Sequence, residues 1–174
     1  MKGLSCHLPA KLIALTMVGA VLMSGSCTTS RGEGFAIYLT AGDIPPARMP
    51  VLSHVDIAEQ PVISVSDVIA YDAKTHEITL TASAYERIAM LEVPVGGRSF
   101  LVCVDRKPIY WGAFWTPLSS ASFGGVTIMK PLSPQNVNAV RLELGYPSPS
   151  FFQGEDPRAN PEVMESLQQA GKLK

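Results

Sequence analysis

His54, His76 and nearby carboxylates have the side chains that acid–base or metal chemistry would require. His54 and Asp56 are two positions apart, a spacing that puts both side chains on the same face of a strand. His76 is the third candidate ligand, but a closed site also needs supporting partners, and no sequence feature pairs these segments. The sequence therefore predicts polar surface positions here, without a bound metal or other cofactor.

Serines supply the candidate nucleophiles, within the stretch SSAS at positions 119–122. They lie outside any G-x-S-x-G motif, and a triad would have to recruit His54 or His76 from distant parts of the chain. Three acids offer paired carboxylates, although their sequence positions do not show that they converge: Asp67, Asp72 and Glu77. We expect a non-catalytic protein. The alternative is an envelope hydrolase with a site around His54 and His76.

An aromatic cluster occupies the stretch PIYWGAFWTP, residues 108–117, which holds both tryptophans of the chain. The first interpretation is a core wedge between sheet and helix. The second is a recognition patch for a peptide, a glycan or a partner protein, together with Phe151 and Phe152. The third is contact with lipid head groups. The candidate partner-binding residues are Tyr110, Trp111, Phe114 and Trp115.

The same stretch allows geometric predictions. Residues 108–111 should form a strand with Tyr110 and Trp111 on opposite faces. The chain should turn after Gly112, because Pro117 disfavours a continuing central strand. We expect at least one of Trp111 and Trp115 to be substantially exposed.

The N-terminal residues indicate export. Lys2 and Lys11 precede an uncharged stretch, residues 12–23, and small residues follow up to position 26. This order is typical of a secretory signal. A helix of twelve residues rises about 18 Å, which is short of the roughly 30 Å hydrocarbon core of a bilayer.

The motif LMSGSC at positions 22–27 resembles a bacterial lipobox. Gly25 and Ser26 fit its small positions, whereas Ser24 departs from the usual leucine. The resemblance implies a leader over residues 1–26 and a Cys27 that carries acyl chains such as palmitate. It also implies anchorage to a bacterial membrane. The small polar residues that follow suit a flexible tether over 27–34, and the length of the remaining chain predicts a single domain over 35–174. The alternative is an ordinary signal peptide with a chance cysteine.

Composition narrows the function of the predicted mature chain. Lys2 and Lys11 are the charged residues of the leader, so the remaining 148 residues carry 12 basic and 15 acidic side chains, a net charge of −3. This balance, without a Lys/Arg run, gives no support to nucleic-acid binding. Beyond Cys27, Cys103 is the one remaining cysteine, and it lies in the apolar run FLVCV. We expect it to be buried and unreactive.

Hydrophobic periodicity predicts an α+β fold, with a mixed or antiparallel sheet, one helix packed on a face and a C-terminal helix. Thr81 should cap the first helix, and Asn160 and Gly171 should bound the second, which we expect to dock loosely. The expected strands are 35–41, 75–81, 100–104, 108–111, 126–129 and 140–144. The expected helices are 82–91 and 161–170, with a helical turn at 66–69 and a loop at 119–125.

Residues 75–130 resemble part of the large extracytoplasmic domain of SecD/SecDF translocon subunits. The matching positions are Leu80, Thr81 and Ala84, then Phe100–Lys107, then Gly124, Gly125 and Ile128. The family's transmembrane helices are missing, and YWGAFWTP replaces an aliphatic stretch. The resemblance implies a SecD-like fold and, at most, a link to protein export. We therefore expect a lipid-anchored envelope protein with a binding or assembly role and a protein or peptide partner.

Overall fold

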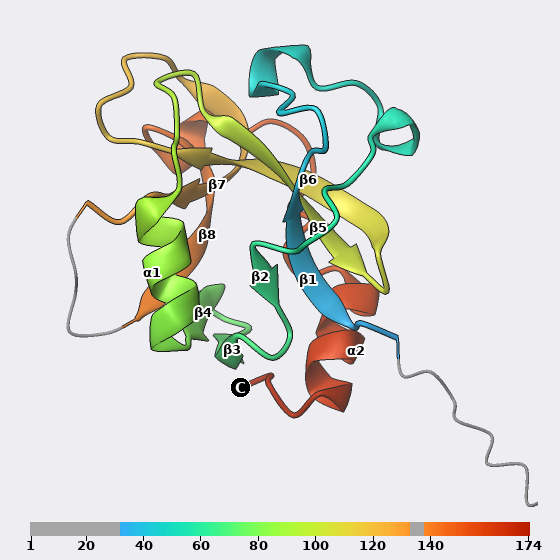
Figure 1. Ribbon diagram of the computed structural model, residues 1–174. Helices are drawn as coiled ribbons and strands as arrows, with labels where there is room; N and C mark the ends of the chain where they lie inside the picture. The colour runs from blue at the N-terminus through green and yellow to red at the C-terminus, as the bar shows by residue number, and fades with distance from the viewer. Residues whose placement is uncertain (1–31, 133–137) are drawn as a thin grey trace, which may run out of the picture. The chain divides into compact units, whose positions relative to one another are not determined.

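The computed structural model describes residues 32–132 and 138–174, and all statements below concern these residues. The predicted leader, Cys27 and most of the predicted tether lie outside them. The described chain forms one eight-stranded sheet and two α-helices (Figure 1). Neighbouring strands are antiparallel except for the parallel pair β6 and β7. The predicted α+β class with a mixed sheet is confirmed.

The elements have the following bounds. The strands are β1 Phe35–Leu39, β2 Ile63–Ser64, β3 Val68–Asp72, β4 Glu77–Leu80, β5 Arg98–Val104, β6 Lys107–Trp115, β7 Phe123–Met129 and β8 Ala139–Tyr146. The helices are α1 Ala82–Met90 and α2 Pro161–Gln169. Short 3-10 turns cover Pro46–Arg48, Leu52–His54 and Pro149–Phe151.

The sheet curls around a single main core. Its spatial order is β2-β1-β5-β6-β7-β8-β4-β3, so its two edge strands are β2 and β3. These edges are joined by only three residues, 65–67, which requires the sheet to bend until the edges meet. All eight strands and both helices contribute buried side chains to this core. We call the junction of β2 and β3 the seam.

The helix boundaries follow the predicted capping signals. The Thr81 hydroxyl accepts a hydrogen bond from the backbone N–H of Ala84 at 3.3 Å, which begins α1. The Asn160 side chain accepts from the N–H of Glu162 at 2.9 Å, and Gly171, with φ of +67°, ends the C-terminal helix.

The expectation that the C-terminal helix docks loosely is wrong. Val163 and Leu167 of α2 are completely buried, and Ser166 between them is nearly so. A narrow apolar stripe suffices because the curled sheet surrounds this face of the helix with side chains from several strands.

Two further expectations are corrected by strand pairing. The predicted helical turn at 66–69 is a turn at 65–67 followed by β3, because Val68 pairs with Leu80 of β4. The predicted loop at 119–125 ends early, because Phe123 pairs with Tyr146 and begins β7. In both places the strand pairing shifts register, and this irregularity hides the alternation of apolar and polar residues that would have indicated a strand.

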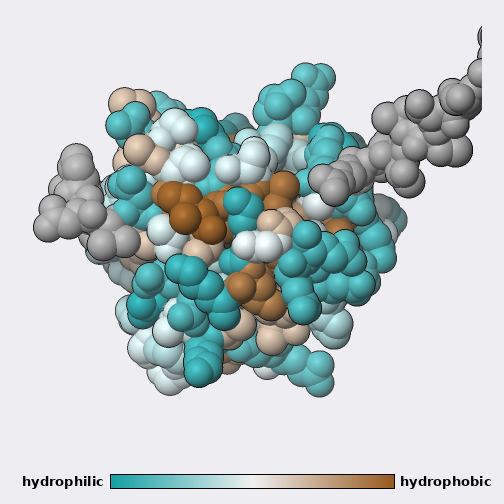
Figure 2. All heavy atoms as spheres, turned by 90° about the horizontal axis from the view of Figure 1, so that it is seen from below, coloured by the Kyte–Doolittle hydropathy of each residue, from teal (hydrophilic) through white to brown (hydrophobic). Residues whose placement is uncertain are grey.

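The outer face of the sheet is covered differently from the inner one. Over β1 and β5, a second small core is closed by the segment that carries the first two 3-10 turns. Figure 2 shows the side that lies at the bottom of Figure 1, where hydrophilic residues interrupt the apolar ones. The outer face of β6, β7 and β8 instead carries aromatic rings.

Candidate binding surface

Strand β6 continues through Gly112, so the predicted turn after that residue is wrong. Gly112 is paired on one side with Phe100 of β5 and on the other with Val126 of the parallel strand β7. A Cβ atom at this position would collide with the Val126 carbonyl and the Phe100 ring. The glycine therefore allows close approach of three strands, and pairing on both sides holds the chain extended up to Trp115.

The extended strand divides the aromatic cluster between two faces. Tyr110 and Phe114 are buried in the main core, and the Phe114 ring lies 5.2 Å from that of Phe100. Trp111 packs against the outer, second core. The prediction that Tyr110 and Trp111 point to opposite faces is confirmed, because strand side chains alternate.

Trp111 and Trp115 belong to a row of four aromatic rings that we call the aromatic ladder, completed by Phe123 and Tyr146. Phe123 lies between the indoles, with ring centroids 5.6 Å from Trp111 and 5.2 Å from Trp115. Its ring is nearly parallel to that of Trp115, at 15°. Tyr146 follows at 5.8 Å from Trp115. These separations fall in the range of favourable aromatic pairs, about 4.5–7 Å.

Glycines make room for two of these rings. Gly97 has φ of +79°, and a Cβ there would overlap the six-membered ring of Trp115. A Cβ at Gly125 would similarly meet the Phe123 ring. The stacking of Trp115 on Phe123 therefore depends on backbone positions where only glycine fits without displacement.

The rings of the ladder differ in exposure. Trp115 is only 3% exposed, whereas Trp111, Phe123 and Tyr146 are half-buried. The expectation of a substantially exposed indole is wrong, because Phe123 covers the face of Trp115 and also contacts Trp111. The indole Nε1 of Trp115 has no hydrogen-bond partner among the described residues.

The four residues predicted to bind a partner therefore do not form one surface. Tyr110 and Phe114 are core residues, and the tryptophans acquire new neighbours in Phe123 and Tyr146. Phe152 packs against the main core, and Phe151 is 44% exposed, but neither is among the stacked rings of the ladder. Phe123 was missed because it falls in the predicted loop at 119–125, and Tyr146 because it is distant in sequence from β6.

The histidines do not come together as a metal or hydrolytic site. His54 is exposed in a 3-10 turn, so its spacing to Asp56 does not place the two on one strand face. His76 is buried, 8% exposed, and adopts a left-handed φ of +54° just before β4. Its Nδ1 lies 2.9 Å from the hydroxyl of Tyr71.

Around His76 lies a partly buried polar cluster that ties the segment before α2 to the sheet. Arg158 forms a two-point ion pair with Asp156 and donates to the Leu142 carbonyl at 2.7 Å. Burial and the positive charge of Arg158 lower the pKa of His76. The neutral imidazole with a tyrosine partner serves as a structural hydrogen-bonding group here, and it lines neither of the cavities described below.

The three candidate carboxylates have separate local partners. Asp72 accepts backbone hydrogen bonds from Lys74 and Thr75, and Glu77 pairs with Arg141 at 2.9 Å. Asp72 and Glu77 are brought opposite each other by the pairing of β3 with β4. Each carboxylate nevertheless makes its hydrogen bonds or ion pair with its own partners, and no hydrogen bond joins the two.

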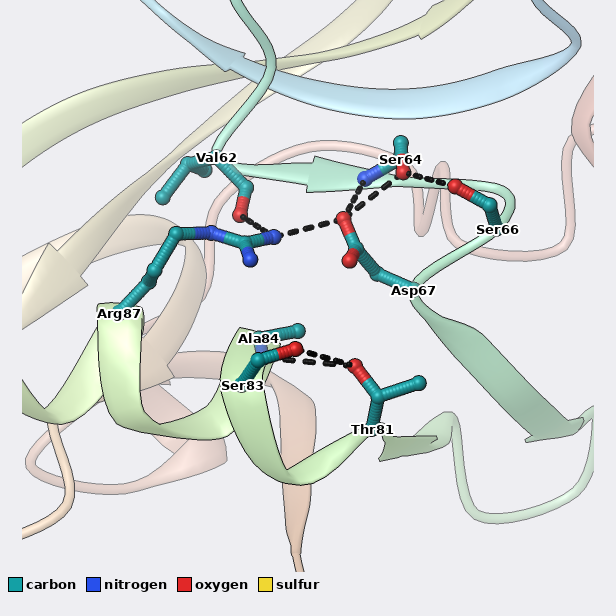
Figure 3. A network of polar contacts seen from close by, with 8 residues as sticks. All are labelled: Val62, Ser64, Ser66, Asp67, Thr81, Ser83, Ala84 and Arg87. Atoms are coloured by element: carbon teal, nitrogen blue, oxygen red, sulfur yellow. Dashed lines mark hydrogen bonds and ion pairs between the residues drawn. The ribbon is translucent and has the colours of Figure 1, made fainter.

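Asp67 instead lies at the seam. Its carboxylate accepts hydrogen bonds from the N–H and hydroxyl of Ser64 and from Arg87 of α1 (Figure 3). Burial alone would raise the pKa of this carboxyl, but the bonds from Ser64 and Arg87 outweigh it and lower the pKa. Arg87 also approaches the Val62 carbonyl at 3.5 Å, so one side chain joins both edges of the sheet to the helix.

The thiol of Cys103 and the hydroxyl of Ser119 likewise have structural roles. Cys103 is completely buried, as predicted, and burial raises the pKa of its thiol to about 12. Ser119 is 8% exposed, and its hydroxyl makes hydrogen bonds with backbone atoms of Ala121. A thiol that stays protonated and a hydroxyl engaged in a turn are poor nucleophiles.

Two cavities open on the described surface. The larger, about 850 Å³, lies beside α2 and the residues leading into β1. Most of the charged residues in its lining are acidic, but Glu33 is paired with Arg106 and Glu162 with Lys107. The smaller, about 580 Å³, opens where β7 ends and β8 begins, and Tyr85 of α1 lines it.

Two kinds of feature were sought within residues 32–132 and 138–174. This part of the chain contains no group of three or more His, Cys, Asp or Glu side chains arranged to hold a metal ion. None of its helices has the length and apolar character needed to cross a membrane.

Comparison of the chain with known proteins adds no assignment. It matches no protein-family model, no curated protein and no solved structure.

Proposed function

We propose that this protein is a lipid-anchored component of the bacterial envelope with a binding or assembly role, and that the aromatic ladder is its partner-binding surface. The observation that carries the proposal is the difference between the two faces of β6. The inner rings, Tyr110 and Phe114, are 6% and 0% exposed. On the outer face Trp115 is also covered, at 3%, but the other three rings of the ladder, Trp111, Phe123 and Tyr146, are half-buried.

The composition and rigidity of the ladder support recognition. Tryptophan and tyrosine are enriched at binding hot spots because each offers a large apolar surface at low entropic cost. Here the pairing of β6 with β7 fixes the backbone that carries the tryptophans, so little backbone ordering would be needed on binding. The unpartnered N–H of Trp115 is a donor that a ligand acceptor could satisfy if the covering rings shift.

The proposed anchor would keep this surface close to the membrane. Only four residues lie between Cys27 and Gly32, where the described domain begins, and these five steps along the chain span at most about 17 Å. A partner captured by the ladder would then be an envelope protein, a peptide or a glycan rather than a cytosolic molecule.

We further propose a SecD-like domain, with α1 packed on one face of the sheet and α2 as a separate C-terminal helix. The order β4, α1, β5 and the buried Ala84 and Ile88 support it. A link to protein export rests on this resemblance alone.

The alternative, an envelope hydrolase around His54 and His76, has less support. His54 is exposed, and the buried His76 is engaged with Tyr71 in the partly buried polar cluster.

The test of the binding role is capture of partners from envelope extracts by immobilised protein. Trp111→Ala should strongly reduce capture while leaving the fold intact. Met90→Ala is the matched control, because Met90 is an apolar side chain, 81% exposed, that is not part of the ladder. Equal capture by the protein and by Trp111→Ala would refute the ladder as the binding surface.

A further inference from the structure

The smaller cavity, about 580 Å³, has the character of a ligand site in its own right. Its volume falls within the range of about 300–1,000 Å³ that is usual for such sites. Leu132 at its lip is 68% exposed, a large apolar side chain left facing solvent. The larger apolar side chains of its lining are Tyr85, Pro117, Met129, Pro131, Leu132 and Val140.

Tyr85 supplies a polar group that lacks a partner. Its side chain comes from the buried face of α1 and the residue is only 4% exposed. Within the described part of the chain, its hydroxyl forms no hydrogen bond. This hydroxyl has almost no accessible surface, so a ligand in the cavity could satisfy it only after a small shift of the side chains that cover it. Such a shift would recover the free energy that a buried hydroxyl without a partner costs.

The charged residues around this cavity balance one another. Glu77 and Arg141 form an ion pair at 2.9 Å. Lys130 and Glu143 carry opposite charges, and among the described residues neither has a salt-bridge partner. A rim with no net charge and free groups of both signs favours a neutral ligand that has both donors and acceptors.

We propose that this cavity binds a short, uncharged, apolar peptide segment of a partner protein. Its apolar side chains would contact the apolar lining, and one backbone carbonyl would accept a hydrogen bond from the Tyr85 hydroxyl. Each peptide unit offers one N–H and one C=O, which suit Glu143 and Lys130 respectively. The site is additional to the aromatic ladder and does not depend on it.

The test is an NMR titration of the ¹⁵N-labelled full chain with the capped tripeptide acetyl-Leu-Ala-Leu-amide. We expect saturable shifts at Tyr85, Lys130 and Val140. Tyr85→Phe keeps the ring but removes the hydroxyl, and should weaken binding about tenfold. Tyr110→Phe is the matched control, because Tyr110 also has an unpartnered, buried hydroxyl but does not line the cavity.

Several results would overturn the proposal. Absence of saturable shifts would exclude a peptide site, and equal binding by Tyr85→Phe would exclude the hydrogen bond. Equally tight binding of acetyl-Leu-Lys-Leu-amide or acetyl-Leu-Glu-Leu-amide would contradict the neutral-ligand argument. A loss of folding stability in Tyr85→Phe would show that the hydroxyl already has a partner within the chain. Trp111→Ala should bind the tripeptide normally, so failure of the ladder proposal is distinguishable.

Discussion

The Asp67 carboxylate and the Arg87 guanidinium, 2.7 Å apart, connect the seam of the curled sheet to helix α1 (Figure 3). Asp67 lies in the three-residue link between the edge strands, and Arg87 also reaches the Val62 carbonyl beside β2. The pair therefore acts where an open sheet would otherwise leave two edges exposed to other strands.

We expect Asp67→Ala to be more damaging than Arg87→Ala. Loss of the carboxylate removes hydrogen bonds from the Ser64 N–H and hydroxyl as well as the ion pair, at a cost of about 2 kcal/mol in unfolding free energy. Loss of Arg87, which is 46% exposed at its side chain, should cost about 0.5–1 kcal/mol. Urea denaturation of both variants measures the order, and a reversed order would contradict the central role of Asp67.

His76 should make folding stability depend on pH in the mildly acidic range. Because its pKa is lowered in the folded protein, the folded state favours the neutral imidazole. This contribution is complete above the unfolded-state pKa of about 6.5 and is lost as the pH falls below it toward the folded-state pKa.

The variant His76→Asn tests this pH dependence, since asparagine tolerates the left-handed backbone of this residue. We expect the decline in unfolding free energy between pH 6.5 and 5 to be smaller in the variant. The lowered pKa values of Asp67, Asp72 and Asp156 act at more acidic pH, below about 4, so the two windows separate. An unchanged pH profile would mean that another group titrates in this window.

Local signals in the sequence were sufficient to predict several helix ends and strands. Thr81, Asn160 and Gly171 mark helix ends because capping depends on residues within one turn. Ile78 and Leu80 alternate with polar residues, which revealed β4, and the continuous apolar run around Cys103 revealed a strand covered on both faces.

The candidate site depended on non-local pairing, which the sequence does not display. The parallel pairing of β6 with β7 brings Phe123 between Trp111 and Trp115. Tyr146 reaches Trp115 after Gly145, whose φ of +67° interrupts the alternation of β8. The residues that flank the tryptophans do not indicate either contact. The sequence therefore predicted Trp111 and Trp115 of the ladder but not Phe123 and Tyr146.

The proposed lipid anchor makes a prediction that is independent of the fold. Changing Cys27 to Ser removes the thiol that would carry the acyl chain, so the protein should move from the membrane to the soluble fraction. Cell fractionation followed by mass measurement of the N-terminus would establish this. Continued processing before position 27 with unchanged membrane association would contradict the lipoprotein assignment.

The most direct test of the ladder is the accessibility of Trp111 with and without partner. In the variant Trp115→Phe, which retains an aromatic ring, Trp111 is the sole tryptophan, and acrylamide quenching reports its exposure. We predict clear quenching in the isolated protein, in keeping with its half-buried state, and protection once the partner captured from envelope extracts is added. Full protection of Trp111 in the isolated protein, or quenching unchanged by the partner, would contradict the claim that this face of the sheet is the binding surface.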